Sequence, residues 1–283
     1  MAKARTVRRT LTVLVALVLA GVGVYIASAV LNRTDAPVVE GCTAIANGNK
    51  QSLATDQAAN ASLITAVAVR RGLPARAATI AIATSMQEAK LRNINYGDHA
   101  GPDSRGLFQQ RPSQGWGTED QLMDPVYATN AFYDALVKIP GYETLTVTEA
   151  AQKVQRSAYP EAYSQHEDLG RAYASALTGN SHASLDCALR KPDSAGDPIA
   201  FRAALTQSYG ATPASVAAGQ TVTVRADSAL AWSVAQWAVA NAKGLAVARV
   251  DVDGQAWVRE GNKGWTDAQT QPGVVVITLA PAP

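Results

Sequence analysis

Glu88 and the run Gly106-Leu107-Phe108-Gln109 are the residues whose types and spacing indicate chemistry. We expect Glu88 at the end of an Ala-rich helix, facing a loop that contains the glycine and the glutamine. A carboxylate held in this way can protonate the oxygen of a glycosidic bond, and amide side chains can hydrogen bond a sugar. The pattern therefore indicates cleavage of a glycan.

Residues 92–121 are rich in Gly, Pro, Asp, Asn and Gln, which predicts one long loop. A loop of this length inside a compact domain is usually functional. Gly106 would let the backbone approach a sugar, and Gln109 or its neighbour Gln110 would hydrogen bond to it. Asp98 has two interpretations: it activates a water for hydrolysis, or it caps a turn of the backbone.

This part of the chain resembles the lysozyme-like superfamily, that is, the lytic transglycosylases and the goose-type lysozymes. The resemblance covers about residues 52–180 and rests on Met86-Gln87-Glu88, Asn95-Tyr96-Gly97-Asp98, Gly106-Leu107-Phe108-Gln109, Asp124-Pro125, Asn130 and Tyr133. It implies a mainly α lysozyme-like domain that binds peptidoglycan glycan strands without a cofactor. Glu88 would then act as acid and as base, while the 6-hydroxyl of the substrate closes an anhydro ring.

Three further residues are candidate substrate contacts under this resemblance. Asn130 and Tyr133 belong to a helix of the family, although Tyr133 has the alternative of a core position. Tyr159 stands at a late Ala-Tyr motif, of which Ser157-Ala158-Tyr159-Pro160-Glu161 keeps only the Ala-Tyr pair. The family also has Ser after the catalytic Glu, where this chain has Ala89. These departures leave an alternative open, a non-catalytic peptidoglycan-binding or scaffolding protein of the cell envelope.

The N-terminus has the pattern of a membrane anchor. Residues 1–10 carry four cations and no acid, and residues 11–31 carry no charge. As a helix, the uncharged stretch would extend about 31 Å, enough for a hydrocarbon core of about 30 Å. We expect a single-pass protein with a cytoplasmic N-terminus and the remaining chain outside. Cleavage after Ala29 by a signal peptidase, which would give a secreted protein, is the alternative.

Charge and histidine spacing bear on other classes of function. The formal net charge of the chain is +2, and without the four N-terminal cations it is +2 − 4 = −2. We therefore expect no nucleic acid partner. The three histidines, His99, His166 and His182, are not spaced as ligands on one helix, so we expect no metal site.

The chain has two cysteines, Cys42 and Cys187, which bracket the expected catalytic domain. We predict a disulfide between them, because both fall on the side of the anchor where thiols are oxidised. Two free buried thiols are the alternative.

The order of expected elements predicts two domains after the anchor. Residues 32–50 are expected to be a stalk, and residues 51–190 an all-α domain with helices near 52–71, 74–91, 125–138, 147–156 and 161–178. A Pro, Gly, Ser and Asp rich stretch at 190–198 marks a boundary. Residues 191–283 follow as a small α+β domain, in which Asp253-Gly254 predicts a hairpin. Its role is open, and a protein partner is possible.

Overall fold

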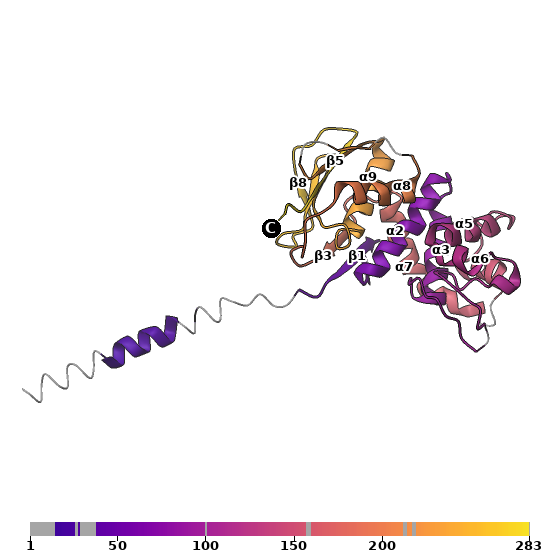
Figure 1. Cartoon of the computed structure of the whole chain (residues 1–283), viewed down its shortest axis with the longest axis horizontal. Coiled ribbons are helices and arrows are strands. Elements are labelled where there is room, and N and C mark those ends of the chain that lie inside the picture. The colour runs from indigo at the N-terminus through magenta and orange to yellow at the C-terminus, as the bar shows by residue number, and fades with distance from the viewer. Residues whose placement is uncertain are drawn as a thin grey trace, which may run out of the picture. The chain divides into compact units, whose positions relative to one another are not determined.

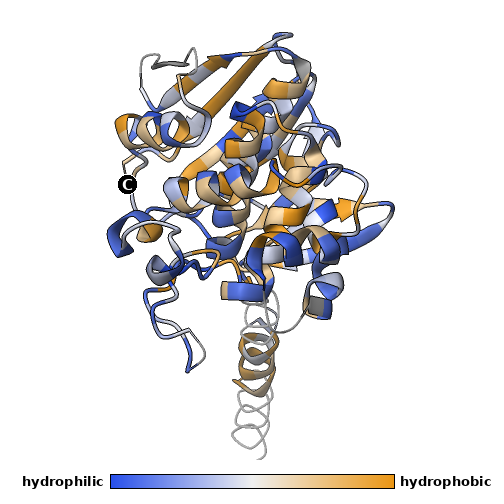
Figure 2. Cartoon of the chain, turned by 90° about the vertical axis from the view of Figure 1, so that its right-hand side faces the viewer, coloured by the Kyte–Doolittle hydropathy of each residue, from blue (hydrophilic) through white to orange (hydrophobic). Residues whose placement is uncertain are grey.

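The computed structural model describes residues 15–25, 28, 38–99, 101–156, 160–211, 214–216 and 219–282. The chain divides into two units, residues 1–38 and residues 39–283. In the first unit, residues 15–25 are helical and hydrophobic, as Figure 2 shows. Several helices and strands of the second unit are labelled in Figure 1.

The predicted membrane anchor at residues 11–31 is not supported. The helix described there covers residues 15–25, which extend only about 16 Å. In the described part of the chain, we find no helix with the length and apolar composition needed to cross a bilayer. The prediction of a transmembrane helix, and with it that of a single-pass membrane location, is therefore contradicted.

The second unit begins with strands, whereas the sequence analysis assigns residues 32–50 to a stalk. Strands β1 (Gly41–Ala46) and β2 (Asn49–Leu53) pair antiparallel, and β3 (Leu185–Ala188) joins β1 on its other side in the order β2-β1-β3. Asn47 and Gly48 both have positive φ, which is the geometry of a two-residue hairpin turn. The expected all-α class is therefore wrong for this region, because the Asn-Gly turn pairs two strands.

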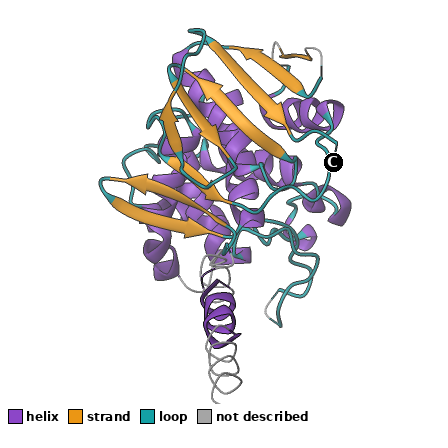
Figure 3. Ribbon diagram, turned by 90° about the vertical axis from the view of Figure 1, so that its left-hand side faces the viewer, coloured by secondary structure: helices purple, strands orange, loops and turns teal. Residues whose placement is uncertain are grey.

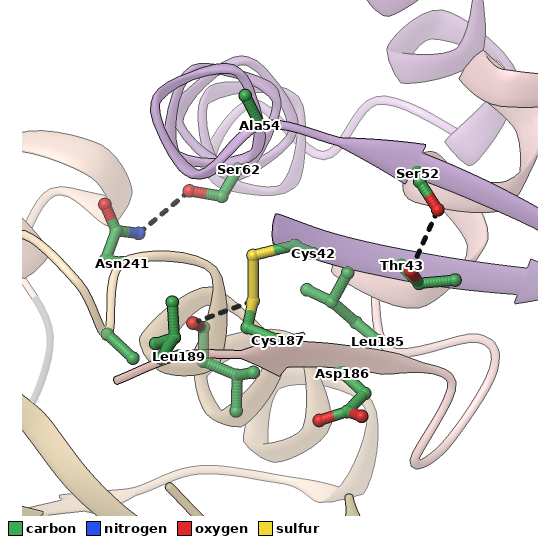
Figure 4. The surroundings of a disulfide bond; sticks show 12 residues. Cys42, Thr43, Ser52, Ala54, Ser62, Leu185, Asp186, Cys187, Leu189 and Asn241 are labelled. Carbon is green, nitrogen blue, oxygen red and sulfur yellow. Dashed lines mark hydrogen bonds between the residues drawn. A yellow bond between two sulfur atoms is a disulfide. The ribbon is translucent and has the colours of Figure 1, made fainter. Parts of the chain in front are cut away.

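The disulfide between Cys42 and Cys187 connects β1 to β3. The two residues are directly opposite each other in the antiparallel register, and their sulfur atoms are 2.01 Å apart. Figure 4 shows the bond between the two strands, below the helix that begins after Ala54. The bridge closes a loop of 145 residues, so it constrains the unfolded chain strongly.

Helices make up the middle of the second unit. They are α2 (Thr55–Arg70), α3 (Ala75–Ala89), α4 (Glu119–Met123), α5 (Pro125–Leu136), α6 (Val147–Gln155) and α7 (Glu167–Leu177), with short 3-10 turns η1 (Pro112–Gln114) and η2 (Pro160–His166). The N-caps follow local chemistry, since Asp124 caps α5 ahead of a proline and Thr146 forms a capping box with Glu149.

Helix α3 is central, because small side chains let its neighbours approach closely. Most of its residues from Ala77 to Ser85 are buried, and α7 packs on it at Gly170. A Cβ at Gly170 would be 2.6 Å from the carbonyl oxygen of Thr79, so a larger residue would separate the helices. The last turn of this closely packed helix carries Glu88.

A larger sheet forms from the C-terminal part of the chain. Its order is β4-β5-β9-β6-β7-β8, with β4 (Ala214–Val216), β5 (Thr221–Arg225), β6 (Val247–Val252), β7 (Gln255–Val258), β8 (Trp265–Asp267) and β9 (Val274–Leu279), and each neighbouring pair is antiparallel. The hairpin predicted at Asp253-Gly254 joins β6 to β7. Figure 3 shows this sheet in front of the helices α8 (Pro198–Tyr209) and α9 (Ser228–Ala240).

Helix α9 joins the larger sheet to the first part of the unit. The Gln236 side chain accepts from the amides of Ser184 and Leu185 and donates to the carbonyl of Ala176 at 2.6 Å. Trp237 is buried beside Phe201. Residues 39–283 therefore share one core, and the division predicted near residue 190 stays a prediction.

Candidate functional site

Glu88 lies in the last turn of α3, where a half-buried carboxylate meets two hydrogen-bond donors. The hydroxyl of Tyr163 donates to Glu88 Oε1 at 2.6 Å. The side-chain amide of Gln155, the last residue of α6, also hydrogen bonds to this carboxylate. Both partners are neutral, so the carboxylate has no ion pair among the described residues.

The surroundings shift the pKa of Glu88 upward. Burial is the largest cause, because it disfavours the charged form. The hydrogen bonds from Tyr163 and Gln155 lower the pKa, and the negative charge of Asp98 raises it. The effect of burial is larger than that of the two hydrogen bonds, so the net shift of the pKa is upward. A general acid requires a raised pKa, because it must keep its proton until it reacts.

Two contacts attach the loop of residues 92–121 to the helices around Glu88, and a third joins two residues of the loop itself. Ser85 Oγ donates to the carbonyl of Leu107 at 2.8 Å, and Gln155 Nε2 donates to the carbonyl of Phe108 at 2.8 Å. The amide of Gly106 donates to the carbonyl of Ile94 at 2.8 Å. Gln155 thus hydrogen bonds to both the loop and the carboxylate of Glu88.

Gly106 packs against the main chain at Leu122 and does not face open space. It is buried with a φ of +77°, and a Cβ there would be 2.2 Å from the carbonyl oxygen of Leu122. The glycine expected to approach a sugar therefore contacts the chain itself. Its role in this structure is to let the loop close against α4.

The two loop aspartates differ in their surroundings. Asp98 is exposed, accepts from the amide of Gly101 at 2.8 Å, and is close enough to influence Glu88. Asp103 accepts from the amide of Ser113 at 3.0 Å and pairs with Arg111 at 2.8 Å. These contacts hold the pKa of Asp103 well below its usual range. Of the two, Asp98 is the carboxylate associated with Glu88.

The two glutamines after Phe108 are placed differently. Gln109 is half-buried, has a φ of 48°, and its side chain reaches only the carbonyl of Gly106 at 3.4 Å. Gln110 is buried and donates to the carbonyl of Ala128 at 3.1 Å. Gln109 is therefore the better placed of the two for a ligand. The substrate contact expected of Gln110 stays a prediction, and its side chain is buried in this structure.

Asn130 and Tyr133 on α5 have structural contacts. Tyr133 is fully buried and donates to the carbonyl of Ile64 at 3.0 Å, and burial raises the pKa of its hydroxyl. Asn130 Oδ1 accepts from Arg71 at 3.0 Å, and its Nδ2 donates to the carbonyl of Val126 at 2.8 Å. Tyr133 thus occupies the core position named as its alternative, and the substrate contacts expected of Asn130 and Tyr133 stay predictions.

Tyr163 and Gln155 were not singled out from the sequence. The expected tyrosine was Tyr159, which lies outside the described residues. The signal for Tyr163 was present, because the Ala-Tyr pair at 158–159 recurs at 162–163. For Gln155 no local signal exists, since its contacts with Phe108 and Glu88 join segments distant in sequence.

The site gives no indication of a metal centre. Over the described ranges, no group of three or more His, Cys, Asp or Glu side chains is arranged to hold an ion.

Comparisons of the chain with family models and with curated proteins give no match. The chemistry of the site is therefore argued from its own geometry.

Proposed function

We propose that this protein cleaves the glycan strands of cell-wall peptidoglycan, with Glu88 as the general acid and base. The observation that carries the proposal is the half-buried Glu88, which has a raised pKa, no cationic partner among the described residues, and a loop attached beside it. The resemblance of residues 52–180 to lytic transglycosylases supports the same chemistry. A disulfide, which persists in oxidising surroundings, is compatible with the compartment where peptidoglycan lies.

The proposed reaction transfers two protons through Glu88, one out to the leaving group and one in from the substrate. Glu88 gives its proton to the glycosidic oxygen, the bond from that oxygen to C1 breaks, and C1 becomes oxocarbenium-like. The Glu88 carboxylate then takes the proton of the 6-hydroxyl of the same sugar, and that oxygen attacks C1 to close the anhydro ring. Glu88 ends protonated, so the cycle needs neither water nor a second carboxylate.

Hydrolysis is the alternative reaction, and in it Asp98 would act as the base that activates a water. A second carboxylate would have to activate a water on the opposite face of the sugar. Asp98 is exposed and influences the carboxyl of Glu88. The product separates the two reactions, since hydrolysis leaves a reducing end and transglycosylation leaves an anhydro end that is one water lighter.

One observation favours a second function, a glycan-binding protein without turnover. The donors Tyr163 and Gln155 stabilise the charged form of Glu88, which opposes its use as an acid. Ala89 also lacks the hydroxyl that the family has at this position. In this alternative the protein would bind peptidoglycan as a scaffold.

Incubating the purified full-length chain with cell-wall sacculi distinguishes these functions. We expect soluble fragments with anhydro ends, detected by mass spectrometry, and a loss of about 10²- to 10⁴-fold in the rate of release for Glu88→Gln. Glu143→Gln is the matched control, because Glu143 is exposed and outside the site. Sacculus binding without release by the wild-type chain would exclude the enzyme and leave the scaffold.

A second variant tests whether Tyr163 positions and tunes the acid. Its hydrogen bond lowers the pKa of Glu88, so Tyr163→Phe should raise that pKa further. Glu88 would then stay protonated to higher pH, and the alkaline limb of the rate profile should move upward. A lower rate with an unmoved limb would mean that Tyr163 supports only the fold.

A further inference from the structure

A cavity of about 200 Å³ lies in the C-terminal part of the second unit, and Glu88 does not line it. Its walls come from the segment 192–197 before α8, the segment 243–246 after α9, and Arg259 after β7. Glu40, just before β1, completes it. Segments distant in sequence thus meet around one space.

Arg259 is the buried charge of this cavity. It is 5% exposed, its Nε donates to the carbonyl of Arg190 at 2.6 Å, and its Nη1 donates to that of Ala242 at 2.9 Å. No carboxylate of the described residues pairs with it directly. Its Nη2 also has no hydrogen-bond acceptor among the described residues, and solvent reaches this atom. Buried charges are normally paired, so this guanidinium can bind a negatively charged group of a ligand.

Glu40, whose charge acts on Arg259, is already paired with other cations. Its Oε2 pairs with Lys243 at 2.7 Å and with Arg190 at 3.2 Å, and its Oε1 accepts from the amide of Arg190 at 3.1 Å. These contacts, led by Lys243, lower the pKa of Glu40 to about 2. The charge of Glu40 is therefore offset without Arg259.

Two aspartates remain on the cavity wall. Asp197 is the N-cap of α8, where its Oδ1 accepts from the amide of Ile199 at 2.8 Å. Asp193 is exposed, and in the described part of the chain its carboxylate has no hydrogen bond or ion pair, although its charge reaches Arg259. Arg259 is thus the cation of the wall, and Asp193 the anion, that neither pairs with another side chain nor caps a helix in the described part of the chain.

We propose that this cavity binds a free α-amino acid, with the ligand's carboxylate at Nη2 of Arg259 and its ammonium group at Asp193. A zwitterion matches both charges, whereas a simple anion would be attracted by Arg259 and repelled by Asp193. The volume fits a ligand of this size, since sites for larger organic molecules measure about 300–1,000 Å³. The site is independent of glycan cleavage at Glu88.

Titration of the full-length chain followed by NMR tests the site. The amides of Gly196 and Gly244, which line the cavity, report binding, and that of Gly254 in the β6–β7 turn is the reference. We expect saturable shifts of the first two with L-alanine. Acetate and methylammonium, which each keep one charge, should bind about tenfold more weakly or worse. No saturable shift with about 10 mM L-alanine would overturn the proposal.

Variants at the two charges separate recognition from folding. Arg259→Gln should abolish the response to L-alanine, but it also removes two contacts with main-chain carbonyls. Asp193→Asn avoids this problem, because Asp193 is exposed, and it should weaken L-alanine about tenfold while leaving acetate unweakened. Lys191→Gln, which changes an exposed cation beside the cavity, should bind as wild type. Equal affinities for L-alanine and acetate, or an unchanged affinity in Asp193→Asn, would overturn the assignment.

Discussion

Glu88 and Glu40 are two enclosed glutamates with opposite surroundings. Glu88 has a tyrosine hydroxyl and an amide as partners, and burial raises its pKa. Glu40 pairs with Lys243 and Arg190, and its pKa is lowered to about 2. The folded surroundings therefore favour the protonated form of Glu88 and the ionised form of Glu40.

This difference in pKa distinguishes two regions. The surroundings of Glu88 suit proton transfer, and those of Glu40 stabilise the fold. Around Glu40, cations from two later segments and the disulfide at Cys42 hold β1 against the rest of the unit. Around Glu88, the charge has no compensating cation among the described residues, so its ionisation costs free energy in the folded state.

Removing the disulfide should give the largest effect on the Glu40 side. The double variant Cys42→Ala, Cys187→Ala should lose about 4 to 5 kcal/mol of unfolding free energy in the loop-entropy model, since the bridge spans 145 residues. Denaturant unfolding measures the loss, and adding a reductant should not destabilise this variant further. A wild type that is equally stable with and without reductant would show that the ion pairs suffice.

Replacing Glu40 should have the next largest effect, and it should depend on pH. The pKa of Glu40 is lowered from 4.5 to about 2, so its stabilisation is present above pH 4.5 and is lost as the pH falls toward 2. Glu40→Gln should therefore cost about 1 to 3 kcal/mol at pH 7 and little near pH 2. Unfolding at several pH values measures this difference.

Glu260 provides the matched control for Glu40. Its carboxylate is 3.8 Å from Lys191, and both side chains are at least 80% exposed. Exposed pairs contribute little, so Glu260→Gln should change the stability by less than about 1 kcal/mol at any pH. If both variants behaved alike, the enclosure of Glu40 would not matter.

The sequence was informative where the signal is local. Helix spacing and the Asp253-Gly254 turn predicted elements that the structure has, and Glu88 lies in the last turn of its helix as expected. The Asn47-Gly48 turn carried the same kind of signal, but its neighbours were assigned to a stalk. The membrane helix predicted from the apolar run at 11–31 is not supported, since the described helix there covers residues 15–25.

Contacts between distant segments could not be predicted in this way. Tyr133 shows the limit, since a tyrosine on a helix is as compatible with a groove as with the carbonyl of Ile64 that it contacts. Gln155 and Tyr163 reach Glu88 only because α6 and η2 pack beside α3. Arg259 is similar, because its burial comes from strands and loops that meet in the folded chain.

Glu88→Gln gives the smallest effect on stability, and its sign is opposite to that of Glu40→Gln. The folded-state pKa of Glu88 is above 4.5, so stability is highest below pH 4.5 and falls as the pH rises through the folded value. Glutamine cannot ionise and can still accept from Tyr163. The variant should therefore match the wild type at pH 4 and be more stable at pH 8, as measured by denaturant unfolding. A variant that is less stable at pH 8 would mean that the Glu88 carboxylate is stabilised like that of Glu40, which would argue against its role as an acid.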